Sequence, residues 1–143
     1  MTEPRNPDFE AHIRESFARQ GMMELLRAEL LEVEHGRIVI AAPIRPEVTQ
    51  QNGYSHAGLA WSIGDSACGY AAQSVMDAGR DVLSVELKIN MLAPGRGERL
   101  VAEGRVVRSG RTLVVIAGDV HAEEGGRRTH IATILGTMIA TGG

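Results

Sequence analysis

Residues 56–76, near the middle of the chain, limit the possible folds more than any other part of the sequence. This segment contains no proline and is mostly apolar, and its length favours a helix over a strand. More than half of its residues are glycine, alanine, serine or cysteine. Three are glycines, each of which costs a helix about 1 kcal/mol relative to alanine. We therefore expect a helix whose small residues let a sheet wrap tightly around it.

Strand patterns lie on both sides of this segment. Before it, residues 28–34 and 37–44 predict two strands around a tight turn. After it, runs rich in valine, isoleucine, leucine and threonine predict four more strands, at residues 81–92, 98–108, 111–120 and 127–140. The connections between these four are too short for crossovers, so we expect an antiparallel meander.

The N-terminal region has helical spacing instead. Phe9, Ile13 and Phe17 predict a helix from Asp8, as its N-cap, to about Gln20. A further helical turn is expected at residues 22–26 and a polar loop at residues 45–55.

These elements fit one domain spanning residues 1–143, with residues 1–8 as a loose lead-in. The predicted fold class is α+β, an antiparallel curled sheet of about six strands wrapped around a long central helix. On that sheet Glu103, Arg105 and Asp119 are expected to face outward.

Composition argues against several classes of protein. The formal net charge is −3 with no basic block, which argues against nucleic-acid binding. The single cysteine, Cys68, cannot form a disulfide within the chain, and the histidines show no metal-ligand spacing. The polar and acidic N-terminal residues do not predict a signal peptide, and the sequence contains no run of about 18 apolar residues. We expect a cytoplasmic enzyme or binding domain with no metal, no nucleic-acid partner and no membrane partner.

A compound motif occupies residues 50–72, QQNGYSHAGLAWSIGDSACGYAA. With the element order, it resembles the hotdog-fold thioesterases, most closely the PaaI-like (phenylacetate-pathway) family. In that family an Asn or Gln precedes a loop, His-Gly-Gly opens the central helix, and an acid follows inside it. The matching residues here are Gln50, His56, Ala57, Gly58 and Asp65. Ala57 replaces the usual glycine, and both this change and Gln50 keep the chemical group that is needed.

The resemblance implies an acyl-CoA thioesterase, and the residue types suit that chemistry. Backbone N–H groups of Ala57 and Gly58, at the start of a helix, would polarise the thioester carbonyl. Asp65 would act as general base or as nucleophile, a choice that the sequence leaves open. Coenzyme A belongs to the substrate, so no separate cofactor is expected.

The spacing of Ala57 and Asp65 predicts the assembly. Eight residues of helix separate them by about 12 Å, too far for both to reach one carbonyl. Asp65 must then come from a second subunit, which predicts a homodimer with two equal sites at its interface, as the family implies. A dimer of dimers stays open.

Other residues are assigned by position. Gln50 would orient the attacking water or the thioester oxygen, and His56 would complete the catalytic set or simply cap the helix. Gly58 and Asn52 are assigned to substrate binding, and Ser84 resembles a Ser or Thr that some relatives place near the water. The turn at residues 108–111 could receive CoA phosphates through Arg108, Arg111 and the N–H of Gly110, or hold only solvated charges.

Alternatives remain for both the residues and the function. Asp65 could be a structural carboxylate, and Cys68 is expected to be a buried small residue rather than a nucleophile. A hotdog protein that binds acyl-CoA without turnover is the second hypothesis, and an enoyl-CoA hydratase or dehydratase is the third. Aryl-acetyl, benzoyl-type and medium-chain acyl groups all stay open.

Overall fold

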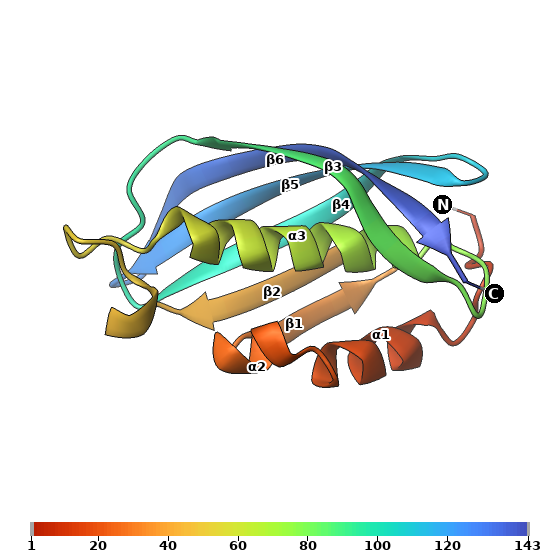
Figure 1. The fold of residues 1–143 in the computed structure, drawn as a ribbon, viewed down its shortest axis with the longest axis horizontal. Helices are drawn as coiled ribbons and strands as arrows, with labels where there is room; N and C mark the ends of the chain where they lie inside the picture. The colour runs from red at the N-terminus through yellow and green to blue at the C-terminus, as the bar shows by residue number, and fades with distance from the viewer. Residues whose placement is uncertain (1, 143) are drawn as a thin grey trace.

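Helix α3 (Ala57–Gln73) lies against one face of a single antiparallel sheet that curls around it (Figure 1). The computed structural model describes residues 2–142. The strands are β1 (Glu29–Glu34), β2 (Arg37–Pro43), β3 (Asp81–Met91), β4 (Arg99–Ser109), β5 (Leu113–Glu124) and β6 (Arg127–Thr141). Their order across the sheet is β1-β2-β4-β5-β6-β3, so the six-stranded α+β prediction is confirmed.

The predicted four-strand meander is wrong in one connection. Strands β4, β5 and β6 do follow one another as hairpins, but β3 pairs with β6 at the edge of the sheet, and β4 pairs with β2. Residues 92–98 therefore pass the ends of β6 and β5. Three inter-strand spacings amount to about 14 Å, and seven extended residues can reach about 23 Å. A short link can therefore pass over two strands, so the length of a link alone does not show which strands pair.

Close contact between α3 and the sheet explains most of the small residues. A Cβ on Gly104 of β4 would lie 2.5 Å from backbone atoms of Ala67 and Cys68, so the strand backbone rests on the helix backbone. A Cβ on Gly64 would lie 2.5 Å from Cδ1 of Ile134. Gly69 differs, because its added Cβ would meet only the Cε atom of Met138, at 4.0 Å. The predicted close packing accounts for Gly64, whereas Gly69 borders open space.

Two N-terminal helices cover the edge of the sheet beside β1 (Figure 1). They are α1 (Phe9–Ala18) and α2 (Gly21–Leu25), and the fully buried Ile13 anchors α1 in the core. Asp8 occupies the N-cap position but makes no side-chain cap bond. Instead Asn6 Oδ1 accepts from the backbone N–H of Asp8 at 3.0 Å.

Residues before α1 are also attached to the rest of the fold. Both Nε and Nη2 of Arg5 donate to the carbonyl of Val75, at 3.0 and 2.7 Å, and Asn6 is buried. The N-terminal segment expected to be loose is therefore held in place at these two residues. A short 3-10 turn (Pro46–Val48) lies in the loop that leads to α3.

The outer face of the sheet carries the charged residues that were expected there. Arg105 Nη1 donates to Asp119 Oδ2 at 2.8 Å, and Arg37 Nε donates to Glu103 Oε2 at 2.8 Å. His130 Nε2 is a further partner of Asp119, at 2.8 Å. Opposite charges thus neutralise one another across neighbouring strands. Among residues 2–142, no helix is both long and apolar enough to cross a membrane.

Candidate active site

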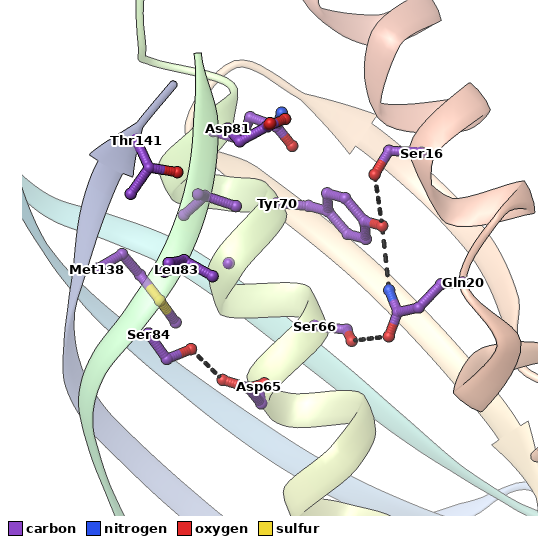
Figure 2. Close-up of a pocket in the computed structure, with 13 residues that line it drawn as sticks. Ser16, Gln20, Asp65, Ser66, Tyr70, Asp81, Leu83, Ser84, Met138 and Thr141 are labelled. Carbon is purple, nitrogen blue, oxygen red and sulfur yellow. Dashed lines mark hydrogen bonds between the residues drawn. The ribbon is translucent and has the colours of Figure 1, made fainter. Parts of the chain in front are cut away.

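Asp65 projects from the middle of α3 toward the edge strand β3. Its Oδ1 atom accepts a hydrogen bond from the hydroxyl of Ser84 at 2.6 Å (Figure 2). Asp65 is half-buried, and Ser84 lies beside an irregularity in the pairing of β3 with β6. Two residues 19 positions apart are therefore joined by a charge-assisted hydrogen bond, a stronger kind than a neutral one.

The Asp65–Ser84 pair stands on the wall of a cavity of about 410 Å³. Helix α3 forms one side of this cavity, α1 a second, and β3 with the end of β6 a third. Gly69 also lines it, which explains why an added Cβ there would meet only the Cε atom of Met138. The carboxylate thus faces a space large enough for a small organic group.

A chain of hydrogen bonds joins α1 to α3 inside the same cavity (Figure 2). The hydroxyl of Tyr70 lies 3.1 Å from Ser16 Oγ and accepts from Gln20 Nε2 at 3.0 Å. Gln20 Oε1 in turn accepts from Ser66 Oγ at 3.0 Å. We refer to Ser16, Gln20, Ser66 and Tyr70 as the α1–α3 polar cluster.

The sequence interpretation missed this cluster. Ser16 lies in the last turn of α1, whereas Gln20 lies beyond that helix and is the N-cap of α2, so the available signal was only a group of polar residues near the junction of the two helices. It could not be assigned without knowing that α1 packs across α3.

The start of α3 is shaped by His56. Its side chain accepts, through Nδ1, from the backbone N–H of Gly58 at 2.8 Å, so His56 is the N-cap of the helix. Of the two roles considered for His56, the structure shows the helix cap. Because the N–H of Gly58 is engaged, the N–H of Ala57 is the donor that remains available, and it has no acceptor among residues 2–142.

Gln50 organises the loop before α3. Its Oε1 atom accepts from the backbone N–H of Asn52 and, at 3.3 Å, from that of Tyr54. The loop is closed by a bridge between Thr49 and Ser55. Gln50 and Asn52 therefore belong with Ala57 at the start of the helix, and within one chain they are not brought to Asp65.

The turn between β4 and β5 lies at the opposite end of α3. Arg111 and Gly110 line a small hollow with Met76, just beyond the C-terminus of the helix. The N–H of Gly110 donates to the carbonyl of Leu113 at 2.8 Å, so it is already engaged. Arg108 and Arg111 are exposed. Within one chain these residues lie apart from Ala57.

Cys68 is fully buried between α3 and the sheet. Burial, and to a smaller extent the nearby charge of Asp65, raises the pKa of its thiol to about 12. A thiol with so high a pKa is almost entirely protonated near neutral pH and is a poor nucleophile. The structure thus agrees with Cys68 as a packing residue.

Comparison with known proteins identifies the family. The Thioesterase superfamily model matches residues 52–129. The crystal structure of a thioesterase family protein from Silicibacter pomeroyi has a TM-score of 0.92 at 41% identity, covering 94% of this chain and 99% of that chain. A candidate esterase from Saccharolobus solfataricus is 36% identical over 95 residues, which are 66% of this chain and 67% of that protein.

A third comparison concerns the fold alone. The PaaI protein of Escherichia coli, from the phenylacetic acid degradation operon, has a TM-score of 0.86 at 18% identity over 96% of both chains. The resemblance drawn from residues 50–72 is thereby confirmed. This chain belongs to the thioesterase superfamily and has its hotdog fold.

Proposed function

We propose that this thioesterase hydrolyses acyl-CoA thioesters and that Asp65 is its catalytic carboxylate. The observation that carries the proposal is the position of Asp65, which is oriented by Ser84 on one oxygen and faces the cavity. No second hydrogen-bond partner of this carboxylate occurs in the described part of the chain, so Oδ2 is available for a water or a substrate. A merely structural carboxylate would be expected to satisfy several neighbouring N–H groups instead.

Two routes of hydrolysis are compatible with this geometry. In the first, Oδ2 removes a proton from a water, whose oxygen attacks the thioester carbon, and the C–S bond breaks to release CoA as a thiolate. In the second, Oδ2 attacks the carbon directly and expels the thiolate, and water then hydrolyses the mixed anhydride. In both, the carbonyl oxygen becomes an oxyanion that needs a hydrogen-bond donor.

The N–H of Ala57 would supply that donor. It lies in the first turn of α3, where the N–H groups have no partner within the helix and the helix dipole favours negative charge. His56 caps the neighbouring N–H of Gly58 and so fixes the direction of this turn. Gln50, in the adjoining loop, would hold the thioester or the attacking water through its Nε2 atom.

Ala57 and Asp65 cannot act on one carbonyl within a single chain. They stand eight residues apart on one continuous helix, about 12 Å along its axis. We propose a C2 homodimer in which Ala57 of one subunit faces Asp65 of the other, giving two equal sites. Arg108 and Arg111 would bind CoA phosphates only if the dimer brings this turn to the mouth of a site.

The test is release of free thiol from phenylacetyl-, benzoyl-, hexanoyl- and lauroyl-CoA, with crotonyl-CoA followed separately for hydration. The proposal expects hydrolysis of at least one thioester. Binding of acyl-CoA without turnover would favour the non-catalytic alternative, and hydration of crotonyl-CoA without thiol release would favour a hydratase.

A further inference from the structure

The cavity beside Asp65 has an unusually polar wall on the side of α1. The α1–α3 polar cluster contributes two hydroxyls, one amide and one phenol to it (Figure 2). Tyr70 is only 6% exposed, and its hydroxyl is hydrogen-bonded within the cluster. Buried polar atoms of this kind need hydrogen-bond partners, because each one left unpaired is costly.

The internal hydrogen bonds do not use the full capacity of the cluster. Gln20 donates one amide hydrogen to Tyr70 and accepts one hydrogen bond from Ser66. Its second amide hydrogen and the second lone pair of Oε1 are still available. The Tyr70 hydroxyl has Ser16 and Gln20 as partners, and a hydroxyl can take part in three hydrogen bonds. A ligand group with both a donor and an acceptor could therefore join the cluster.

Tyr70 and Asp65 stand at different levels of the same helix. Tyr70 follows Asp65 by five residues on α3, which places it about 7.5 Å further along the helix axis. The para position of a phenylacetyl group, or the sixth atom of a straight acyl chain, has a comparable reach. Gly69 keeps the floor between the two points open, since it has no side chain.

We propose that Gln20 and Tyr70 are specificity-determining residues, which select acyl groups that carry a hydroxyl or carbonyl at the end remote from the thioester. This inference rests on the proposed function, because it takes Asp65 to mark the position of the thioester. The link between α1 and α2 is then part of the substrate site and supplies the side chain, Gln20, that recognises the remote end of the acyl group. A purely aliphatic chain would cover the cluster without satisfying it, and the enzyme should discriminate against such a chain.

The test uses two pairs of substrates whose members have the same number of non-hydrogen atoms. One pair is 4-hydroxyphenylacetyl-CoA with 4-methylphenylacetyl-CoA, and the other is 5-hydroxypentanoyl-CoA with hexanoyl-CoA. We expect kcat/KM to favour the hydroxyl member of at least one pair by about tenfold. Gln20→Met and Tyr70→Phe, which keep shape but remove polar atoms, should reduce that ratio to about one.

Arg19→Gln is the matched control, because Arg19 adjoins Gln20 but its side chain is 72% exposed. It should leave the substrate preference unchanged. Circular dichroism and thermal unfolding identify any variant that fails to fold. If one member of the Gln20 and Tyr70 pair cannot be produced, the other carries the test.

Three outcomes would overturn the inference. One is an absence of preference for the hydroxyl member in the wild type, and another is a preference that survives both substitutions. The third is that the two substitutions change KM equally for all four substrates, which would mean that the cavity holds the pantetheine arm of CoA instead.

Binding separates this inference from the proposed function. Calorimetry of the four thioesters on the Asp65→Asn protein measures the same preference without hydrolysis. If no thioester is hydrolysed but the hydroxyl members bind more tightly, the hydrolytic mechanism fails and the specificity site stands. If hydrolysis is observed without any preference in binding or rate, only the specificity site fails.

Discussion

The hydroxyl of Ser84, on the edge strand β3, donates to Oδ1 of Asp65, on helix α3, across 2.6 Å. Ser84 does not need to touch the substrate to matter, because it fixes the direction in which the carboxylate points. We predict that Ser84→Ala lowers kcat about 10- to 100-fold with a much smaller change in KM. Ser84→Thr, which keeps the hydroxyl, should recover most of the rate. A Ser84→Ala enzyme with wild-type kcat would show that the hydrogen bond has no role in turnover.

Ala57 offers a way to remove a single backbone N–H. Proline lacks this hydrogen and is well tolerated at the first position of a helix. His56, the residue before it, has φ −65° and ψ 142°, the extended conformation that a following proline favours. Ala57→Pro should therefore fold normally and lose about 100-fold or more in kcat, measured by thiol release. Retention of full activity would show that this N–H does not stabilise the oxyanion.

Mixing two inactive variants tests whether each site is shared between subunits. A dimer of one Ala57→Pro chain and one Asp65→Asn chain would contain one site with both substitutions and one with neither. Random exchange should restore about a quarter of wild-type activity, because half of the dimers are mixed and each has one intact site. Unfolding and refolding the mixture allows this exchange, with each variant refolded alone as the control. No recovery would mean that Ala57 and Asp65 act from the same chain.

Gly69 lines the cavity, and an added Cβ would meet only the Cε atom of Met138, at 4.0 Å. We predict that Gly69→Ala raises the free energy of unfolding by about 1 kcal/mol, the difference in helix propensity. The same methyl group should reduce kcat/KM for aryl-acyl substrates about tenfold by narrowing the cavity. Gly104→Ala is the comparison, since its Cβ would lie 2.5 Å from backbone atoms of Ala67 and Cys68 and should destabilise the fold. Denaturation in urea and steady-state kinetics measure both effects, and a Gly69→Ala enzyme that hydrolyses aryl substrates normally would place the acyl group elsewhere.

His121 stacks on His130 on the outer face of the sheet, with ring centroids 4.8 Å apart. Burial lowers the pKa of His121, and the positive charges of Arg128 and His130 lower it further, against the opposing effect of Asp119 and Glu103. The unfolded chain then binds a proton more readily than the folded chain does. Stability should fall as pH drops below about 6.5, the unfolded pKa of histidine.

Replacing His121 isolates its share of this pH dependence. His121→Gln should make the free energy of unfolding decline less between pH 7 and 5, measured in urea. Asp119 affects stability in a different pH range. Burial would raise the pKa of Asp119, but hydrogen bonds from Arg105, His130 and Thr133 hold it below its ordinary value. The stability contributed by Asp119 is present above about pH 4, the ordinary pKa of aspartate, and is lost only as the pH falls further. If the free energy of unfolding of His121→Gln declined between pH 7 and 5 as steeply as that of the wild type, His121 would not be a source of the pH dependence.

Periodic patterns in the sequence were sufficient to predict the elements but not all of their neighbours. The small-residue segment predicted α3, and strand-forming runs separated by turn residues predicted six strands near the observed bounds. The position of β3 beside β6 could not be predicted, because a link of seven residues is long enough either for a hairpin or for a passage over two strands. Strand pairing depends on packing between residues far apart in the chain, and local pattern carries little of that information.

The candidate site was predictable where it is local and hidden where it is not. The spacing of Gln50, Ala57 and Asp65 could be read from one stretch of sequence. The hydrogen bond of Ser84 to Asp65 depends on the path of β3, and the contact of Gln20 with Tyr70 depends on α1 lying across α3. Local sequence specifies neither contact.

Thiol release by the wild type beside Asp65→Asn is the most direct test of Asp65 as the catalytic carboxylate. The substitution keeps the shape of the side chain and a hydrogen bond with Ser84, while removing the charge that activates water or attacks the thioester. We predict that kcat falls by about 10²- to 10⁴-fold in a variant that unfolds like the wild type and keeps its oligomeric state. An Asp65→Asn enzyme that hydrolyses acyl-CoA within a few-fold of the wild-type rate would contradict the role assigned to Asp65.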